Sequence, residues 1–440
     1  MLSTPDEHAG PRRQSVRKAG TAGLLGTAIE GYDFAVYAYL VVFIAPLFFP
    51  AENRTVGILA GLLALGAGYL ARPLGGLFFG RLGDRRGRRF ALVVTITMMG
   101  SATFLMGALP TYESIGVWAP VLLVLLRIVQ GFSVGGELMG AATYVTEHGT
   151  GRNHGVLSAI VPFGNSLGGA LAPGVVGVVT LLIADQAMGE WGWRVPLLLS
   201  LPLTVLVLVL RTRLSDSPEF EKLAERQDVT TGSPVREVLA HHRAALLQVV
   251  VLSASVMFVG LFAVSYLTLD MQSTAGRSPG EAARIAAVAS FCLMPCQLVT
   301  GRLVDRFGRF RLQVVLFAAS ACVVVPTMYT ISDPGLPVAA SVLVYVVFYC
   351  VAGCTFIPAF GAFTALFPTR VRYTGSALGF GIGSSIGAGF GPFLSSYSAD
   401  LAGNRYAAAV LFVAVVVLGL VASWTMRPVA GPVAAMTPRR

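Results

Sequence analysis

The amino-acid sequence predicts an all-α membrane protein with twelve transmembrane helices in two pseudo-symmetric six-helix bundles. Hydrophobic residues make up 55% of the 440 positions, charged residues only 12%, and the mean hydropathy is +0.72. Soluble domains carry about 25% charged residues, so lipid must cover a large part of this chain's surface. Two further observations, recurring apolar segments and an internal repeat, define the number and the grouping of the helices.

Apolar segments of about 20 residues, enough to cross a hydrocarbon core of roughly 30 Å, recur along the whole chain. The first is longer than the apolar part of a cleaved signal peptide, which has about 7–15 residues. It also contains Glu30 and Asp33, so we expect it to remain as the first membrane helix. The predicted spans are 20–46, 55–80, 90–109, 117–139, 155–183, 194–211, 244–269, 279–301, 312–331, 338–358, 374–399 and 405–426.

Short connections separate these spans, apart from one polar stretch in the middle of the chain. Within it, Ser217 and Pro218 suit the start of a helix, so we expect an amphipathic segment that runs to Arg226. The expected parts are a cytoplasmic tail 1–19, a bundle 20–211, a cytoplasmic linker 212–243, a bundle 244–426 and a cytoplasmic tail 427–440.

The positive charges are distributed unevenly between the two sides of the predicted helices. Of the 32 arginines and lysines, two lie inside spans and five lie on the side opposite the termini, which leaves 25 on the side of the termini. This bias predicts that both termini are cytoplasmic in a multi-pass protein of the cell membrane. Because the arginines occur in short clusters between apolar runs, the net charge of +10 does not indicate nucleic-acid binding.

A ten-residue motif occurs once in each half of the chain. Gly80–Arg89 joins the second and third spans, Gly301–Phe310 joins the eighth and ninth, and seven of the ten positions match at an offset of 221 residues. Duplication of a six-helix unit explains this repeat. In each copy, Asp84 or Asp305 is a short acidic residue suited to the N-terminus of a helix, where free N–H groups attract an anion.

These motifs resemble a known family. The repeated motif is similar to the signature of the major facilitator superfamily, and five further stretches resemble its metabolite:proton symporters: 30–34 (EGYDF), 71–76 (ARPLGG), 126–137 (LRIVQGFSVGGE), 191–196 (WGWRVP) and 367–375 (FPTRVRYTG). The resemblance implies the major facilitator fold and proton-coupled uptake of a small polar metabolite by alternating access. Members of this family move proline and betaine, citrate, oxoglutarate and shikimate. We expect a functional monomer in the lipid bilayer, with the proton as coupling ion and no cofactor.

Four charged residues fall near the middle of predicted spans, where one charge costs at least about 2.5–3.5 kcal/mol to insert. Glu30 and Asp33 are three residues apart and share one face of the first span. We predict that Asp33, and secondarily Glu30, binds and releases the transported proton. The resemblance implies Arg127 as the partner in this coupling. The alternative is that these charges form permanent ion pairs that only hold the helices together.

Arg72 is the candidate for holding a substrate carboxylate, because its planar guanidinium matches a carboxylate with two parallel hydrogen bonds. The alternatives are a permanent pair with Glu30 or Asp33, or a side chain that extends towards the cytoplasm. Arg194 is a weaker second anchor; because it lies at the entrance of a span, an interfacial structural role is the favoured alternative. Neutral contacts are expected from Gln130, Asn165, Tyr266 and Tyr349, although polar residues in spans often bond a neighbouring helix instead.

The resemblance also implies that the first copy of the motif latches the cytoplasmic ends of the two halves, with span eleven opposite Asp84. A latch that forms in one conformation only would bias alternating access. Positive-inside topology alone would explain the arginines, but not the repeated glycines and aspartates. The expected latch residues are Gly80, Asp84, Arg85, Gly87, Arg88, Glu137, Gly301, Asp305, Arg306, Gly308 and Arg309.

Other functions find less support in the sequence. No intramembrane histidine, nucleophile elbow or phosphate-binding loop motif occurs, which argues against an enzyme and against an ATP-driven pump. The five cysteines lie in apolar segments without histidine, so we predict helix packing and no metal site. The remaining alternatives are a proton-driven exporter and a nutrient receptor that does not transport.

Overall fold

The computed structural model describes residues 9–50, 54–148, 154–212, 234–276, 279–332 and 337–426, and within these ranges every regular element is a helix. Ten helical segments are long and apolar enough to cross a membrane. The long helices α1 (Ala9–Phe48) and α2 (Arg54–Arg86) bring the number to twelve. The predicted fold class is confirmed. The amphipathic segment expected at 217–226 lies outside the described residues.

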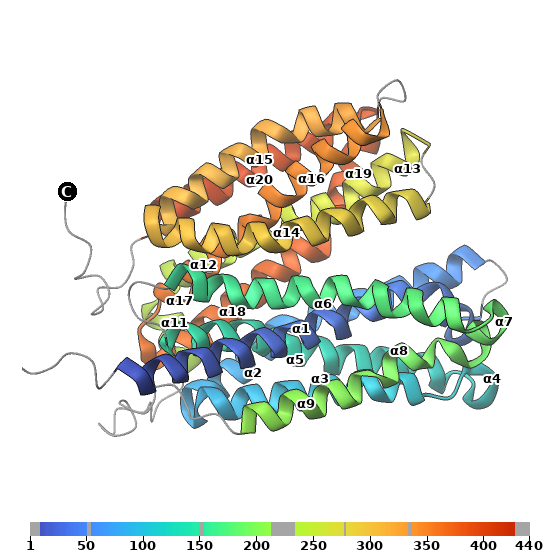
Figure 1. The fold of residues 1–440 in the computed structure, drawn as a ribbon, viewed down its shortest axis with the longest axis horizontal. Helices are drawn as coiled ribbons and strands as arrows, with labels where there is room; N and C mark the ends of the chain where they lie inside the picture. The colour runs from blue at the N-terminus through green and yellow to red at the C-terminus, as the bar shows by residue number, and fades with distance from the viewer. Residues whose placement is uncertain are drawn as a thin grey trace, which may run out of the picture.

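The helices of the N-terminal half form the lower group in Figure 1. After α1 and α2 they are α3 (Arg88–Ala108), α4 (Tyr112–Ile115), α5 (Trp118–His148), α6 (His154–Leu182), α7 (Asp185–Ala187), the π-helical turn η1 (Met188–Gly192), α8 (Arg194–Leu198) and α9 (Ser200–Thr212).

The C-terminal half follows the short helix α11 (Pro234–His241). Its elements are α12 (Arg243–Leu261), η2 (Phe262–Tyr266), α13 (Leu267–Ser273), α14 (Pro279–Phe307), α15 (Arg309–Ser332), α16 (Val338–Cys354), α17 (Phe356–Ala365), η3 (Thr369–Val371), α18 (Arg372–Ser384), η4 (Ser385–Phe390), α19 (Gly391–Ala402) and α20 (Tyr406–Thr425).

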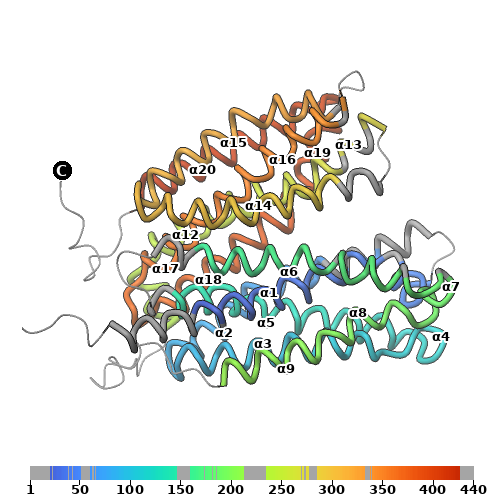
Figure 2. Tube along the Cα trace, viewed as in Figure 1, coloured from blue at the N-terminus to red at the C-terminus, as the bar shows by residue number. Residues whose placement is uncertain are grey.

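The two halves meet at one end of the molecule and diverge towards the other. Figures 1 and 2 show the groups of helices converging at the end that carries α11 and α17, and separating towards the end that carries α4, α7 and α13. At the converging end α18 packs against α2 and α5, and α14 packs against α6. The helices of the two halves are therefore in contact near one membrane face.

Most of the repeated motif is helical, which corrects the expectation of a loop between spans. Helix α2 continues to Arg86 and α14 continues to Phe307. The chain turns only at the next residue, where Gly87 has φ 99° and Gly308 has φ 86°. Glycine adopts these positive φ values at little cost, so one glycine is sufficient to separate two long helices.

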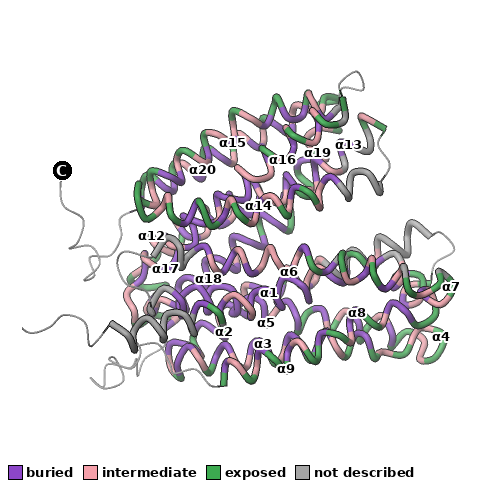
Figure 3. The backbone as a smooth tube through the Cα atoms, in the orientation of Figure 1, coloured by how far each residue is buried: buried purple, intermediate pink, exposed green. Residues whose placement is uncertain are grey.

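Residues are buried between the helices and exposed on the outer faces of the two groups, as the purple and green segments of the backbone in Figure 3 show. Large apolar residues occupy many of the exposed positions, including Leu74, Leu206, Val410 and Leu418. In a membrane protein, such outward apolar faces contact lipid.

Candidate functional site

Four charged side chains of the N-terminal half are buried inside the helix bundle. Glu30 and Asp33 on α1, Arg72 on α2 and Arg127 on α5 all expose 6% or less of their surface. Glycines bring these helices close together: a Cβ atom at Gly131 of α5 would overlap the backbone of α2. Close backbone contact of this kind is typical of small residues in membrane helices.

The guanidinium of Arg72 packs against two aromatic rings that contact each other. Its central carbon lies 4.5 Å from the ring centre of Phe34 and 4.2 Å from that of Tyr69. The two rings pack edge-to-face with their centres 4.9 Å apart. Among the described residues, no carboxylate lies within ion-pair distance of Arg72, and its Nε has no hydrogen-bond partner. A permanent pair with either acidic residue of α1 is therefore not present in this conformation.

Gln130 connects Arg127 to the backbone of α1. The Nη1 of Arg127 donates to the Gln130 side-chain oxygen, and the Gln130 amide donates to the carbonyl of Asp33 (3.0 Å) and to Thr103 (2.8 Å). The guanidinium of Arg127 also lies 3.7 Å from the ring centre of Tyr37. Within the described part of the chain, the hydroxyl of Thr103 lies near the Asp33 carboxylate, but no donor forms a well-aligned hydrogen bond with either carboxylate oxygen. Gln130 therefore links Arg127 to the main chain of Asp33, and the two charged side chains are not ion-paired here.

Three other predicted binding residues make their hydrogen bonds elsewhere. Arg194 donates to the carbonyls of Gly107 (2.8 Å) and Leu109 (2.6 Å), so it attaches α8 to the end of α3 and fits the interfacial alternative. In the C-terminal half, Tyr266 donates to a backbone carbonyl (3.3 Å) and Tyr349 bonds the hydroxyl of a serine on α14 (3.0 Å).

Asn165 lies where α6 packs closely on α1. A Cβ atom at Gly31 would overlap the backbone of Asn165. Asn165 therefore adjoins the helix that carries Glu30 and Asp33 through its main chain.

Asp84 joins the two halves at the converging end. Its carboxylate accepts hydrogen bonds from the backbone N–H groups of Tyr373 (3.3 Å) and Thr374 (2.7 Å), in the first turn of α18. Arg88 holds the same carboxylate at 2.7 Å and donates to the carbonyl of Thr369 at 2.8 Å. Gly80 is required here, because a Cβ atom would lie 2.6 Å from the Cα of Thr374.

The second copy of the motif makes different contacts. Asp305 and Arg306 are exposed, whereas Asp84 exposes only 3% of its surface. Arg309, the equivalent of Arg88, donates to the carbonyl of Gly361 (2.6 Å) in its own half. Gly301 is buried within α14.

A buried ion pair that the sequence analysis missed lies behind Asp84. Glu137 on α5 accepts hydrogen bonds from Arg211 and from Thr95, and Arg211 also donates to the carbonyl of Leu92 at 2.7 Å. Arg211 was counted only as a topology signal, because it directly precedes the polar linker. Its one distinguishing feature in the sequence is its place inside the last turn of an apolar span.

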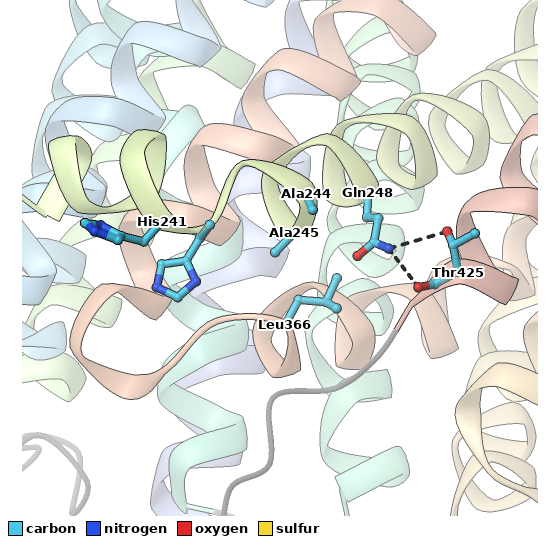
Figure 4. Close-up of a pocket in the computed structure, with 7 residues that line it drawn as sticks. His241, Ala244, Ala245, Gln248, Leu366 and Thr425 are labelled. Carbon is cyan, nitrogen blue, oxygen red and sulfur yellow. Dashed lines mark hydrogen bonds between the residues drawn. The ribbon is translucent and has the colours of Figure 1, made fainter.

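Two further features of the described residues lie outside this group. A pocket of about 350 Å³ is lined by His241, His242, Ala244, Ala245, Gln248, Leu366 and Thr425. Figure 4 shows Gln248 bonded to Thr425, with its amide 2.9 Å from the Thr425 carbonyl, which attaches α12 to α20. No group of three potential metal ligands occurs among the described residues.

The family model of the Major Facilitator Superfamily matches residues 24–382. The chain belongs to this superfamily. Among curated proteins it is 35% identical over 434 residues to the glycine betaine/proline/ectoine/pipecolic acid transporter OusA of Dickeya dadantii, which covers 96% of this chain and 86% of the relative. It is 31% identical to the shikimate transporter of Escherichia coli, over 94% of this chain and 95% of the relative.

The fold is also that of a solved superfamily member. The proton:xylose symporter XylE, bound to 6-bromo-6-deoxy-D-glucose, superposes with a TM-score of 0.78 at 16% identity, over 94% of this chain and 95% of the other. Together with the curated relatives, the apolar helices make this superfamily member a membrane transport protein and not an enzyme.

Proposed function

We propose that the protein takes up a small metabolite that carries a carboxylate, in particular a zwitterion such as proline or betaine, together with a proton. The observation that carries this proposal is Arg72, a buried arginine that packs against two aromatic rings and has no ion-pair partner among the described residues. A charge is retained in such a place for a function. The curated relatives support the substrate class, since one transports betaine and proline and another transports shikimate.

Arg72 is the anchor that we assign to the substrate carboxylate. Its fork of N–H donors fits a carboxylate with two parallel bonds, and the flanking rings of Phe34 and Tyr69 restrict its orientation. Arg127 lies over the same Phe34 ring, 5.4 Å from its centre, so a second positive charge faces the same region. Two guanidinium groups around one ring give the site a preference for anionic groups.

Asp33, and secondarily Glu30, is the proton carrier in this proposal. Burial of an ionised carboxylate without a hydrogen-bond partner is costly, and a proton removes that cost. The Asp33 carboxylate is fully buried, and among the described residues no donor forms a well-aligned hydrogen bond with it. In this conformation Arg127 is bonded to Gln130, so pairing with Asp33 would require a rearrangement during the transport cycle.

Alternating access follows if the converging end faces the cytoplasm, as the arginine bias predicts. The conformation described is then outward-facing, with the contacts of Asp84 holding the cytoplasmic side closed. Opening these contacts would release substrate and proton inside. We propose that the chain works in this way as a monomer in the cell membrane.

The test is uptake into liposomes with an imposed pH gradient. We expect the purified protein to accumulate proline or betaine when the outside is acidic, with protons entering at the same time. Shikimate serves as the comparison substrate for an anion without a cationic group. Binding of these compounds without any proton flux would contradict the symport mechanism and favour a receptor or a facilitator.

A further inference from the structure

A slot in α1 holds the guanidinium of Arg211. A Cβ atom at Gly26 would overlap Nη2 of Arg211, so only glycine at this position lets the side chain lie against α1. Arg211 exposes 2% of its surface and reaches Glu137 across this slot. The arginine at the end of α9 is thus built into the space between α1, α3 and α5.

Glu30 lies one turn further along the same face of α1. Residues four apart on a helix are neighbours, about 6 Å from each other, so Glu30 follows Gly26 directly on this face. Glu30 exposes 2% of its surface, and its Oε2 has no hydrogen-bond partner among the described residues. The charges within electrostatic range of Glu30 are Glu137, Arg72 and Arg211.

In this conformation Arg211 is ion-paired with Glu137 and not with Glu30. Both carboxylate oxygens of Glu137 are occupied, one by Arg211 and the other by Thr95. The neighbouring Gly136 carbonyl accepts a hydrogen bond from the hydroxyl of Tyr373 at 2.8 Å. The ion pair of Glu137 is therefore one residue along α5 from the carbonyl that contacts α18.

We propose that Arg211 is a cation shared between Glu137 and Glu30, and that it couples the proton occupancy of Glu30 to the contact between the two halves. While the halves are joined, Arg211 pairs with Glu137 and leaves Glu30 able to keep a proton. When α18 leaves, Arg211 moves along the Gly26 slot to Glu30 and displaces that proton. The proposal rests on the proposed symport function, and it gives Glu30 high proton affinity outside and low affinity inside.

The test follows the protonation of Glu30 directly. Infrared difference spectroscopy of the purified full chain against pH would identify the carboxyl band that Glu30→Gln removes. We expect Glu137→Gln to move the midpoint of this band to lower pH by about one unit, because it removes a negative charge near Glu30 and also frees Arg211 to pair with Glu30. We expect Arg211→Gln to move the midpoint in the opposite direction.

The double variant separates a moving arginine from a fixed one. If Arg211 moves, Arg211→Gln shifts the midpoint further in the Glu137→Gln background than in the parent, because the arginine is there closer to Glu30. Equal shifts in the two backgrounds would overturn the proposal, as would two single variants that shift the same way. Glu237→Gln is the matched control: its exposed partner Arg370 lies at the same end of the molecule, and the midpoint should not change.

The infrared measurement needs no substrate, so its result can contradict the role of Arg211 without contradicting the proposed symport function. A Glu30 band that does not titrate overturns the inference even if transport is proton-coupled. If Arg211→Gln unfolds, Arg211→Met, which keeps a long unbranched side chain and removes the charge, replaces it in both backgrounds. Thr95 still satisfies one side-chain oxygen in Glu137→Gln. No midpoint shift in that variant also counts against the proposal.

Discussion

The two copies of the repeated motif show how one sequence pattern acquires two roles. Asp84 is buried and receives two backbone N–H groups from the other half, whereas Asp305 is exposed on the surface of its own half. Arg88 crosses to the carbonyl of Thr369, while the equivalent Arg309 stays within the C-terminal half. What differs is the neighbour, since only the first copy faces the N-terminus of α18.

The asymmetry extends to the membrane interior. Among the described residues, the buried charged side chains of the N-terminal half are Glu30, Asp33, Arg72, Asp84, Arg88, Arg127, Glu137 and Arg211, against Asp270 alone in the C-terminal half. The duplicated fold therefore concentrates its charge chemistry in one bundle. The other bundle presents mainly apolar and neutral polar surfaces.

The largest difference between the copies is expected for their aspartates. Asp84→Asn leaves the buried Arg88 without its counter-ion and weakens two hydrogen bonds to α18, and breaking a buried pair costs about 3–5 kcal/mol. We expect transport to fall at least tenfold while membrane insertion is retained. Asp305→Asn should transport like the parent. Equal effects of both substitutions in the uptake assay would contradict the asymmetry.

A second comparison concerns arginines in the two halves. Arg72→Lys replaces the planar fork by a point charge, so we expect substrate affinity to fall about tenfold, which corresponds to ~1.4 kcal/mol. Arg405, which lies 3.6 Å from Asp270 in the C-terminal half, provides the control Arg405→Lys. Calorimetric titration measures both variants. An unchanged affinity in Arg72→Lys would assign this arginine a structural role.

The smallest expected effect concerns the turn glycines. Gly87→Ala and Gly308→Ala both place a Cβ atom at positive φ, which costs roughly 1–2 kcal/mol. Thermal unfolding should show a similar loss of stability in both variants. Transport should decrease more for Gly87→Ala, because its turn adjoins the Arg88 contacts between the halves. A larger transport defect at Gly308 would reverse the assignment of roles.

The sequence predicted the spans and the repeat, because lipid exposure leaves long apolar runs that are visible residue by residue. It did not separate the two copies of the motif, since the neighbour that buries Asp84 comes from almost 290 residues further along the chain. The role of Arg211 is hidden for the same reason. An arginine at the end of a span indicates only which side of the membrane is cytoplasmic, until the structure shows its partner Glu137. Helix breaks at the π-helical turns η1, η2 and η4 also depend on packing.

Only part of the proposed substrate site can be read from the sequence. Arg72, Arg127, Glu30 and Asp33 stood out because a charge inside an apolar run is a local signal. The aromatic partners of Arg72 did not, since phenylalanine and tyrosine are common throughout membrane helices.

The central claim is that a buried carboxylate of the N-terminal bundle couples substrate movement to the proton, and Asp33→Asn tests it most directly. Asparagine keeps the volume of a protonated aspartate but cannot release a proton. We expect this variant to exchange labelled substrate between the two sides of a liposome at a rate similar to the parent. We also expect it to lose both accumulation driven by an imposed pH gradient and the proton influx that accompanies uptake. Accumulation at the parental level would contradict the claim, whereas loss of exchange as well would indicate misfolding, which thermal unfolding would identify.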